Sequence, residues 1–230
     1  MYRNLDASKI VDTAQTLRDR IGERFPSSSL GKVAEEILAT CRQAAATGAW
    51  LARPNVGLRV VVALLLVVLA GGLVGAFASL QFEASFASLS DFFQGLEAAV
   101  NDVLFVGLAV FFLLTLETRL KRQRALAAIH ELRSLAHVID MHQLTKDPAR
   151  LMSAGSDTAA SPPRTMSAFE LTRYLDYCSE LLAVISKLAA LYVQRFQDPV
   201  TLNAVDDVES LATGLSRKIW QKIMILDRPR

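Results

Sequence analysis

The chain has 230 residues, of which 52% are hydrophobic and 21% are charged, and its net charge at pH 7 is +2. Such a small net charge does not favour a nucleic-acid-binding surface, so we expect no nucleic acid among the partners. The only cysteines, Cys41 and Cys178, have no CxxC spacing and fall in parts of the chain that we assign to the reducing cytoplasm. We expect free thiols packed as small apolar residues.

Residues 1–55 are predicted to form a cytoplasmic helical hairpin. Two sets of apolar residues recur at intervals of three and four, which places each set on one face of a helix. Pro26 separates the two sets and Pro54 ends the second. Each stripe has to be covered by another helix. The first set is Ile10, Ala14, Leu17, Ile21 and Phe25, and the second is Leu30, Val33, Ile37, Cys41 and Ala44.

Two uncharged runs follow, at residues 60–80 and 103–116, and both consist almost entirely of apolar residues. They are too continuous for amphipathic helices of a soluble protein and predict transmembrane helices at residues 56–80 and 99–118. The second run covers only about 21 Å as a helix, against about 30 Å of bilayer core, so flanking residues have to complete it.

The charges around these runs predict their orientation. The spacer, assigned to residues 81–98, is acidic and has no Lys or Arg, whereas basic residues precede the first span and follow the second. Positively charged flanks stay in the cytoplasm, so both termini are predicted to be cytoplasmic and the spacer extracytoplasmic. The basic cluster behind the second span is expected to contact anionic headgroups of the bilayer. It consists of Arg119, Lys121, Arg122 and Arg124.

The second span is predicted to continue into the cytoplasm as one helix, because no Pro or Gly occurs from residue 117 to residue 147. We assign residues 119–147 to this extension, 148–166 to a flexible linker rich in Ser, Ala, Gly and Pro, and 167–230 to a C-terminal helical hairpin. Ser167 and Glu170 have the spacing of a capping box, and Asp198 with Pro199 predicts the start of the last helix.

The first helix of this hairpin has a heptad-like apolar stripe from Leu171 to Phe196, and the second helix is expected to bury a comparable face. That second face consists of Leu202, Val205, Leu211, Leu215, Ile219 and Ile223. The sequence thus predicts an all-α, two-span integral membrane protein, with a cytoplasmic bundle of about five helices, one of them continuous with the second span.

Two surfaces predict self-association. One is the heptad-like stripe, which is typical of a coiled coil. The other is a row of small residues in the first span, Gly71, Gly75 and Ser79, which lets helices approach closely. The row packs either against the second span or against a neighbouring subunit. Because both surfaces could join subunits, we expect a homo-oligomer.

All three histidines, His130, His137 and His142, lie close to Asp140 on the predicted extension. Their spacing matches neither H-E-x-x-H nor the E-x-x-H pairs of di-iron bundles, and His130 and His137 lie two turns apart, about 10.5 Å. The first interpretation is that these residues hydrogen-bond the extension to the bundle. The alternatives are a metal or ligand site and, last, catalysis; no cofactor is expected.

The functional hypothesis is a non-enzymatic protein of a bacterial inner (plasma) membrane, whose helical cytoplasmic domain acts in assembly, scaffolding or signal coupling, with a possible cytoplasmic protein partner. One alternative is a small oligomeric ion channel lined by one face of the second span. That face comprises Glu97, Asn101, Leu108, Phe112 and Thr115. A further alternative is an enzymatic or metal-binding site between His130 and His142.

Overall fold

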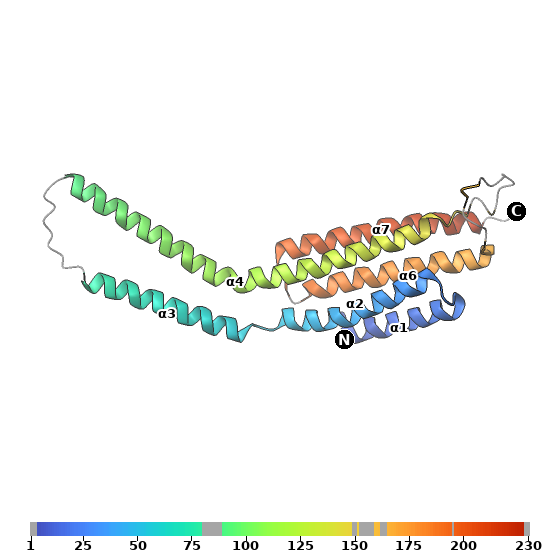
Figure 1. Ribbon diagram of the computed structural model, residues 1–230, viewed down its shortest axis with the longest axis horizontal. Coiled ribbons are helices and arrows are strands. Elements are labelled where there is room, and N and C mark those ends of the chain that lie inside the picture. Colours follow the sequence, from blue (N-terminus) through green and yellow to red (C-terminus); the bar gives the residue numbers. More distant parts are fainter. Residues whose placement is uncertain are drawn as a thin grey trace. The chain divides into compact units, whose positions relative to one another are not determined.

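The computed structural model (Figure 1) describes residues 4–79, 89–148, 151, 159–161, 165–194 and 196–227. Within these residues the chain forms helices and no strands, which confirms the all-α prediction. The helices are α1 (Ala7–Arg24), α2 (Ser29–Ala52), α3 (Val56–Ser79), α4 (Leu89–Leu144), α6 (Ala168–Val193) and α7 (Pro199–Leu226). Residues 89–98 of the predicted spacer form the first turns of α4, and the rest of the spacer and most of the linker lie outside the described residues.

The helices belong to two compact units. The first comprises Met1–Arg53 and Arg122–Arg230, and the second comprises Pro54–Lys121. Helix α4 contributes residues 89–121 to the second unit and residues 122–144 to the first.

The first unit is a helical bundle with one hydrophobic core, built by α1, α2, the second part of α4, α6 and α7. Helix α6 contacts α7 and both helices of the α1–α2 hairpin, which can be followed in Figure 1. The apolar stripes predicted for residues 1–55 are buried in this core, except that Phe25 is only partly buried. Because an amphipathic helix cannot cover its own apolar face, the five segments depend on one another for burial.

The heptad-like stripe of α6 is used inside the chain. Its members from Leu171 to Tyr192 are buried in the core of the first unit, and Phe196 is partly buried against it. The stripe was predicted to join subunits. The position of α6 between its neighbours leaves no part of the buried stripe accessible to a second subunit. The predicted face of α7 is also shifted, because Leu202 is exposed while Val208 and Ala212 are buried.

Local capping determines where the last two helices begin. The Ser167 side chain accepts a hydrogen bond from the Glu170 N–H at 3.2 Å, and the Glu170 carboxylate accepts one from the Ser167 N–H at 2.8 Å, which confirms the predicted capping box. Asp198 is the N-cap of α7 and Pro199 its first residue, also as predicted. Both caps lie in the first unit and position the residues described below.

The second unit consists of α3 and the first part of α4, which are both long and apolar enough to cross a membrane. None of the most apolar stretch of either helix is buried within the protein. Val68 is 71% exposed and Phe105 is 72% exposed. Near the start of α3, the Glu117 carboxylate accepts hydrogen bonds from the Asn55 N–H at 3.1 Å and from Arg59 Nε at 2.7 Å, which joins the two helices.

Candidate functional site

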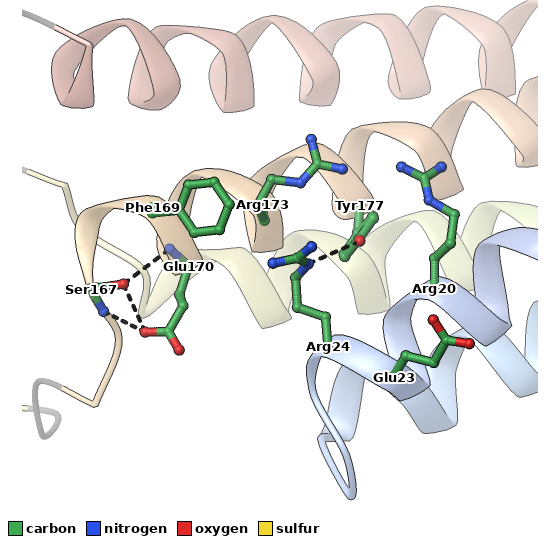
Figure 2. Close-up of a pocket in the computed structure, with 8 residues that line it drawn as sticks. All are labelled: Arg20, Glu23, Arg24, Ser167, Phe169, Glu170, Arg173 and Tyr177. Carbon is green, nitrogen blue, oxygen red and sulfur yellow. Dashed lines mark hydrogen bonds between the residues drawn. The ribbon is translucent and has the colours of Figure 1, made fainter.

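An open pocket of about 630 Å³ lies in the first unit, where α1 ends and α6 begins. Figure 2 shows side chains of the last turns of α1 reaching toward α6. The capping box sets the first turn of α6, so it also sets the positions of the α6 residues in this pocket. The lining residues are Arg20, Glu23, Arg24, Ser167, Phe169, Glu170, Arg173 and Tyr177.

Three arginines of the pocket surround one tyrosine. Arg24 Nε donates a hydrogen bond to the Tyr177 hydroxyl at 3.4 Å. The guanidinium carbons of Arg20 and Arg173 lie 5.3 Å and 5.1 Å from the centroid of the Tyr177 ring, within the range of cation–π attraction. We call Arg20, Arg24, Arg173 and Tyr177 the arginine–tyrosine cluster.

The arginines of this cluster differ in their acidic partners. Arg20 pairs with Glu180 at 3.0 Å, and Arg173 pairs with Asp176 at 2.7 Å. Arg24 has no carboxylate within ion-pair distance among the described residues. Its guanidinium carbon instead lies 5.4 Å from the centroid of the Phe169 ring, which is 63% exposed.

The pKa of Tyr177 indicates the sign of the field inside the pocket. Burial alone would raise this pKa, but hydrogen bonds with Arg24 and Arg173 and the charges of Arg173 and Arg20 outweigh that effect and lower it. Phe25 packs edge-on against Tyr174 and Tyr177, with ring centroids 5.6 Å and 6.3 Å away, and holds them in place. The cluster therefore places guanidinium groups next to the Tyr177 hydroxyl, and their N–H donors can bind an anionic group.

The histidines of the predicted polar site do not converge. His130 and His137 are exposed on α4, and Nδ1 of His142 lies 2.8 Å from the backbone oxygen of Val138 on the same helix. Among the described residues, no three His, Cys, Asp or Glu side chains come close enough together to hold a metal ion. The structure thus does not bring three of the predicted residues His130, His137, Asp140 and His142 together.

Asp140 takes part in a hydrogen-bonded chain that joins α4 to α7. Gln143 Nε2 donates to Asp140 Oδ1 at 2.6 Å, and Lys222 Nζ donates to both Oε1 and the backbone oxygen of Gln143, at 2.6 Å and 2.7 Å. Burial lowers the pKa of Lys222, an effect that the charges of Asp147 and Asp140 oppose. Asp140 acts here as an acceptor within α4, and Gln143, which is not one of the predicted residues, makes the contact with α7.

Replacing Gln143 by alanine is expected to destabilise the bundle by about 2 kcal/mol, because Gln143 is 2% exposed and its loss removes two hydrogen bonds, one of them from a charged donor. Urea unfolding followed by tryptophan fluorescence measures this effect. The matched control is Gln123→Ala, at an exposed position of the same helix, with an expected change within about 0.5 kcal/mol. Equal changes in the two variants would show that the chain from Asp140 to Lys222 does not stabilise the fold.

The four basic residues predicted at lipid headgroups have partners within the protein. In the second unit, Arg119 lies 5.2 Å from the centroid of the Phe112 ring, and the buried Lys121 pairs with Glu117 at 2.9 Å. In the first unit, Arg122 binds Asp198, and Arg124 lies 4.7 Å from the centroid of the Trp50 ring. Contact of this cluster with anionic lipid stays a prediction. We expect this contact mainly at Arg119 and Arg124, which are exposed.

The predicted pore face is exposed along α4, apart from Thr115, which is partly exposed and hydrogen-bonds to the backbone oxygens of Phe111 and Phe112 at 2.9 Å and 3.2 Å. These contacts lie within one helix, so the channel stays a prediction. In α3, a Cβ atom added at Gly71 or Gly75 would meet no atom of the described residues within 4 Å. Packing of these glycines against the second span or a neighbouring subunit stays a prediction. The side chain of Ser79 lies outside the described residues.

The arginine–tyrosine cluster was not predicted from the sequence. Arg20 and Arg24, like Arg173 and Tyr177, are separated by four residues, a spacing that places each pair on one helix face. This spacing predicts each pair from the sequence alone. It does not predict the packing of α1 against α6, which brings the two pairs together.

Comparison of the chain with models of protein families, with curated proteins and with solved structures found no match.

Proposed function

We propose that α3 and the first part of α4 cross a membrane and anchor the helical bundle on its cytoplasmic side. The observation that supports this proposal most directly is the exposure of the large apolar side chains along both helices, including Val68 and Phe105. An exposed apolar surface of this extent is unfavourable in water and is covered when hydrocarbon surrounds it. The basic residues on the outer flanks of both helices give the orientation.

We further propose that the bundle serves assembly, scaffolding or signal coupling. Helix α4 supports this, because a single helix contributes both to the apolar second unit and, through buried residues such as Leu132 and Ile139, to the core of the first. A change in the position of α4 in the membrane would therefore act directly on packing in the bundle. Self-association remains part of the proposal, without the buried α6 stripe as its interface.

Cysteine labelling in intact cells tests the anchoring and its orientation. A membrane-impermeant maleimide is expected to label Gln94→Cys from outside and Met224→Cys only after permeabilisation, because both positions are exposed but lie on opposite sides of the proposed membrane. Burial raises the pKa of both native thiols, Cys41 and Cys178, to about 12, so their background labelling is expected to be low.

The reverse labelling pattern would overturn the orientation. Labelling of both variants only after permeabilisation, together with release of the protein from membranes at alkaline pH, would overturn membrane spanning itself. The unsubstituted protein serves as the control for the native thiols.

A further inference from the structure

We propose that the pocket between the end of α1 and the start of α6 binds a soluble phosphate monoester through the arginine–tyrosine cluster. The pocket lies entirely in the first unit, so this inference does not depend on the membrane anchoring proposed above.

The donors of the cluster match a phosphate group. A guanidinium carries five N–H donors. Arg20 and Arg173 each use Nη1 in an ion pair, and Arg24 uses Nε on the Tyr177 hydroxyl. Arg173 also hydrogen-bonds to Tyr177. Each arginine still retains donors for a ligand. A phosphate monoester offers three terminal oxygens and a charge of about −1.5 to −2 at neutral pH, and arginine is the side chain that best matches this geometry.

The surroundings of the pocket contain carboxylates as well as arginines. Besides three arginines, the pocket is lined by the carboxylates of Glu23 and Glu170. Glu170 is occupied by the capping box, where it accepts hydrogen bonds from the Ser167 N–H and hydroxyl at 2.8 Å each. Glu180 and Asp176 also pair with Arg20 and Arg173. Net charge therefore does not select the ligand, and the preference for phosphate rests on its three terminal oxygens, which can accept from more guanidinium donors than the two oxygens of a carboxylate.

Arg24 is the residue on which the proposal chiefly depends. It forms no ion pair among the described residues, although its charge lowers the pKa of Glu170. Its contacts with Tyr177 and Phe169 hold its guanidinium in place before a ligand arrives. A donor group that is already positioned loses little conformational freedom on binding. Arg24 is exposed on the last turn of α1, so its replacement leaves the hydrophobic core intact.

The position of the pocket in the first unit favours a soluble ligand over a lipid headgroup. The pocket lies where α1 turns into α2, whereas the chain leaves the first unit after Arg53, beyond the other end of α2. The 24 residues of α2 extend over about 36 Å. A phosphate ester free in solution reaches such a position without constraint.

Titration calorimetry on the full chain in nanodiscs of zwitterionic phosphatidylcholine, which has no net charge, tests the proposal, with glycerol 3-phosphate as the probe. At about pH 7.5 we expect saturable binding at one site per chain. Arg24→Gln should weaken it at least about tenfold, since a hydrogen bond to a charged group is lost. Arg24→Lys should give an intermediate loss because it keeps the charge without the planar fork. Arg217→Gln, at an exposed arginine of α7 that does not line the pocket, is the matched control and should bind as the unsubstituted protein does.

Two further titrations identify the ligand class. Affinity should fall from about pH 7.5 to about pH 5, because the second pKa of a phosphate monoester is about 6 and the ligand becomes a monoanion. Acetate should bind at least about tenfold more weakly than glycerol 3-phosphate. Absence of saturable binding, equal losses in Arg24→Gln and Arg217→Gln, or equal affinity for acetate would each overturn the proposal. Arg24-dependent binding to vesicles containing phosphatidic acid, without binding of glycerol 3-phosphate, would overturn the soluble ligand in favour of a lipid headgroup.

Discussion

Replacing Leu182 by alanine is expected to lower the free energy of unfolding of the bundle by about 3 kcal/mol, because the substitution removes a fully buried side chain and leaves a cavity in close-packed surroundings. Leu182 is 0% exposed and belongs to α6, which contacts α7, α1 and α2. The surrounding helices are held by many other buried residues, so they are not expected to close around the cavity.

Urea unfolding in detergent measures this loss, with tryptophan fluorescence as the signal. The chain has two tryptophans, Trp50 and Trp220, and both lie in the first unit, so the signal reports the bundle rather than the apolar helices. The matched control is Leu202→Ala on α7, where the side chain is 37% exposed and the expected loss is within about 1 kcal/mol. A loss of similar size in both variants would contradict the central position of α6 in the core.

Replacing Asp198 by alanine is expected to destabilise the bundle by about 2–3 kcal/mol, through loss of a helix cap and of the acceptors for two other side chains. Asp198 is 4% exposed and accepts hydrogen bonds from the Thr201 N–H at 3.1 Å and hydroxyl at 3.0 Å. It also binds Arg122, with Nη2 at 2.6 Å and Nε at 3.0 Å. Asp198→Asn should lose less, because asparagine also caps helices.

The same urea titration measures the Asp198 variants. Asp207→Ala, at an exposed position inside α7, is the control and should change the free energy of unfolding by no more than about 0.5 kcal/mol. If Asp198→Ala were as stable as this control, the contact between α4 and the start of α7 would contribute nothing to stability.

The pH dependence of stability should also report the contact between Asp198 and Arg122. Burial by itself would raise the pKa of Asp198, but the hydrogen bonds from Arg122 and Thr201 outweigh it and lower the pKa below its ordinary value of 3.8. A carboxylate with a lower pKa in the folded state stabilises the fold above its unfolded pKa, and this stabilisation is lost as the pH falls through the folded pKa. The free energy of unfolding should therefore fall more steeply below about pH 4 in the unsubstituted protein than in Asp198→Asn. Parallel pH profiles would contradict this assignment.

Local features of the structure were predictable because neighbours in the chain determine them. The capping box of Ser167 and Glu170 and the helix start at Asp198 and Pro199 depend on groups at most three residues apart. The apolar stripes of α1, α2 and α6 follow from helical periodicity alone. The long apolar runs of α3 and α4 can likewise be read from the sequence, and both helices are long and apolar enough to cross a membrane.

The partners of each stripe and of each charge depended on tertiary packing. Periodicity shows that the α6 stripe must be covered, but it does not distinguish a second subunit from helices of the same chain. In the structure, helices of the same chain cover it. Likewise, Arg122 has the same charge whether it faces a headgroup or Asp198, which is 76 positions away in the chain. The arginine–tyrosine cluster forms because α1 packs on α6, and Arg20 and Glu180 meet across 160 positions. The amino-acid sequence therefore determined the helices, their ends and the residues that need burial, since these depend on contacts within a turn or two. Only the tertiary structure decided which side chains meet, because contacts between distant segments depend on how all helices share one core.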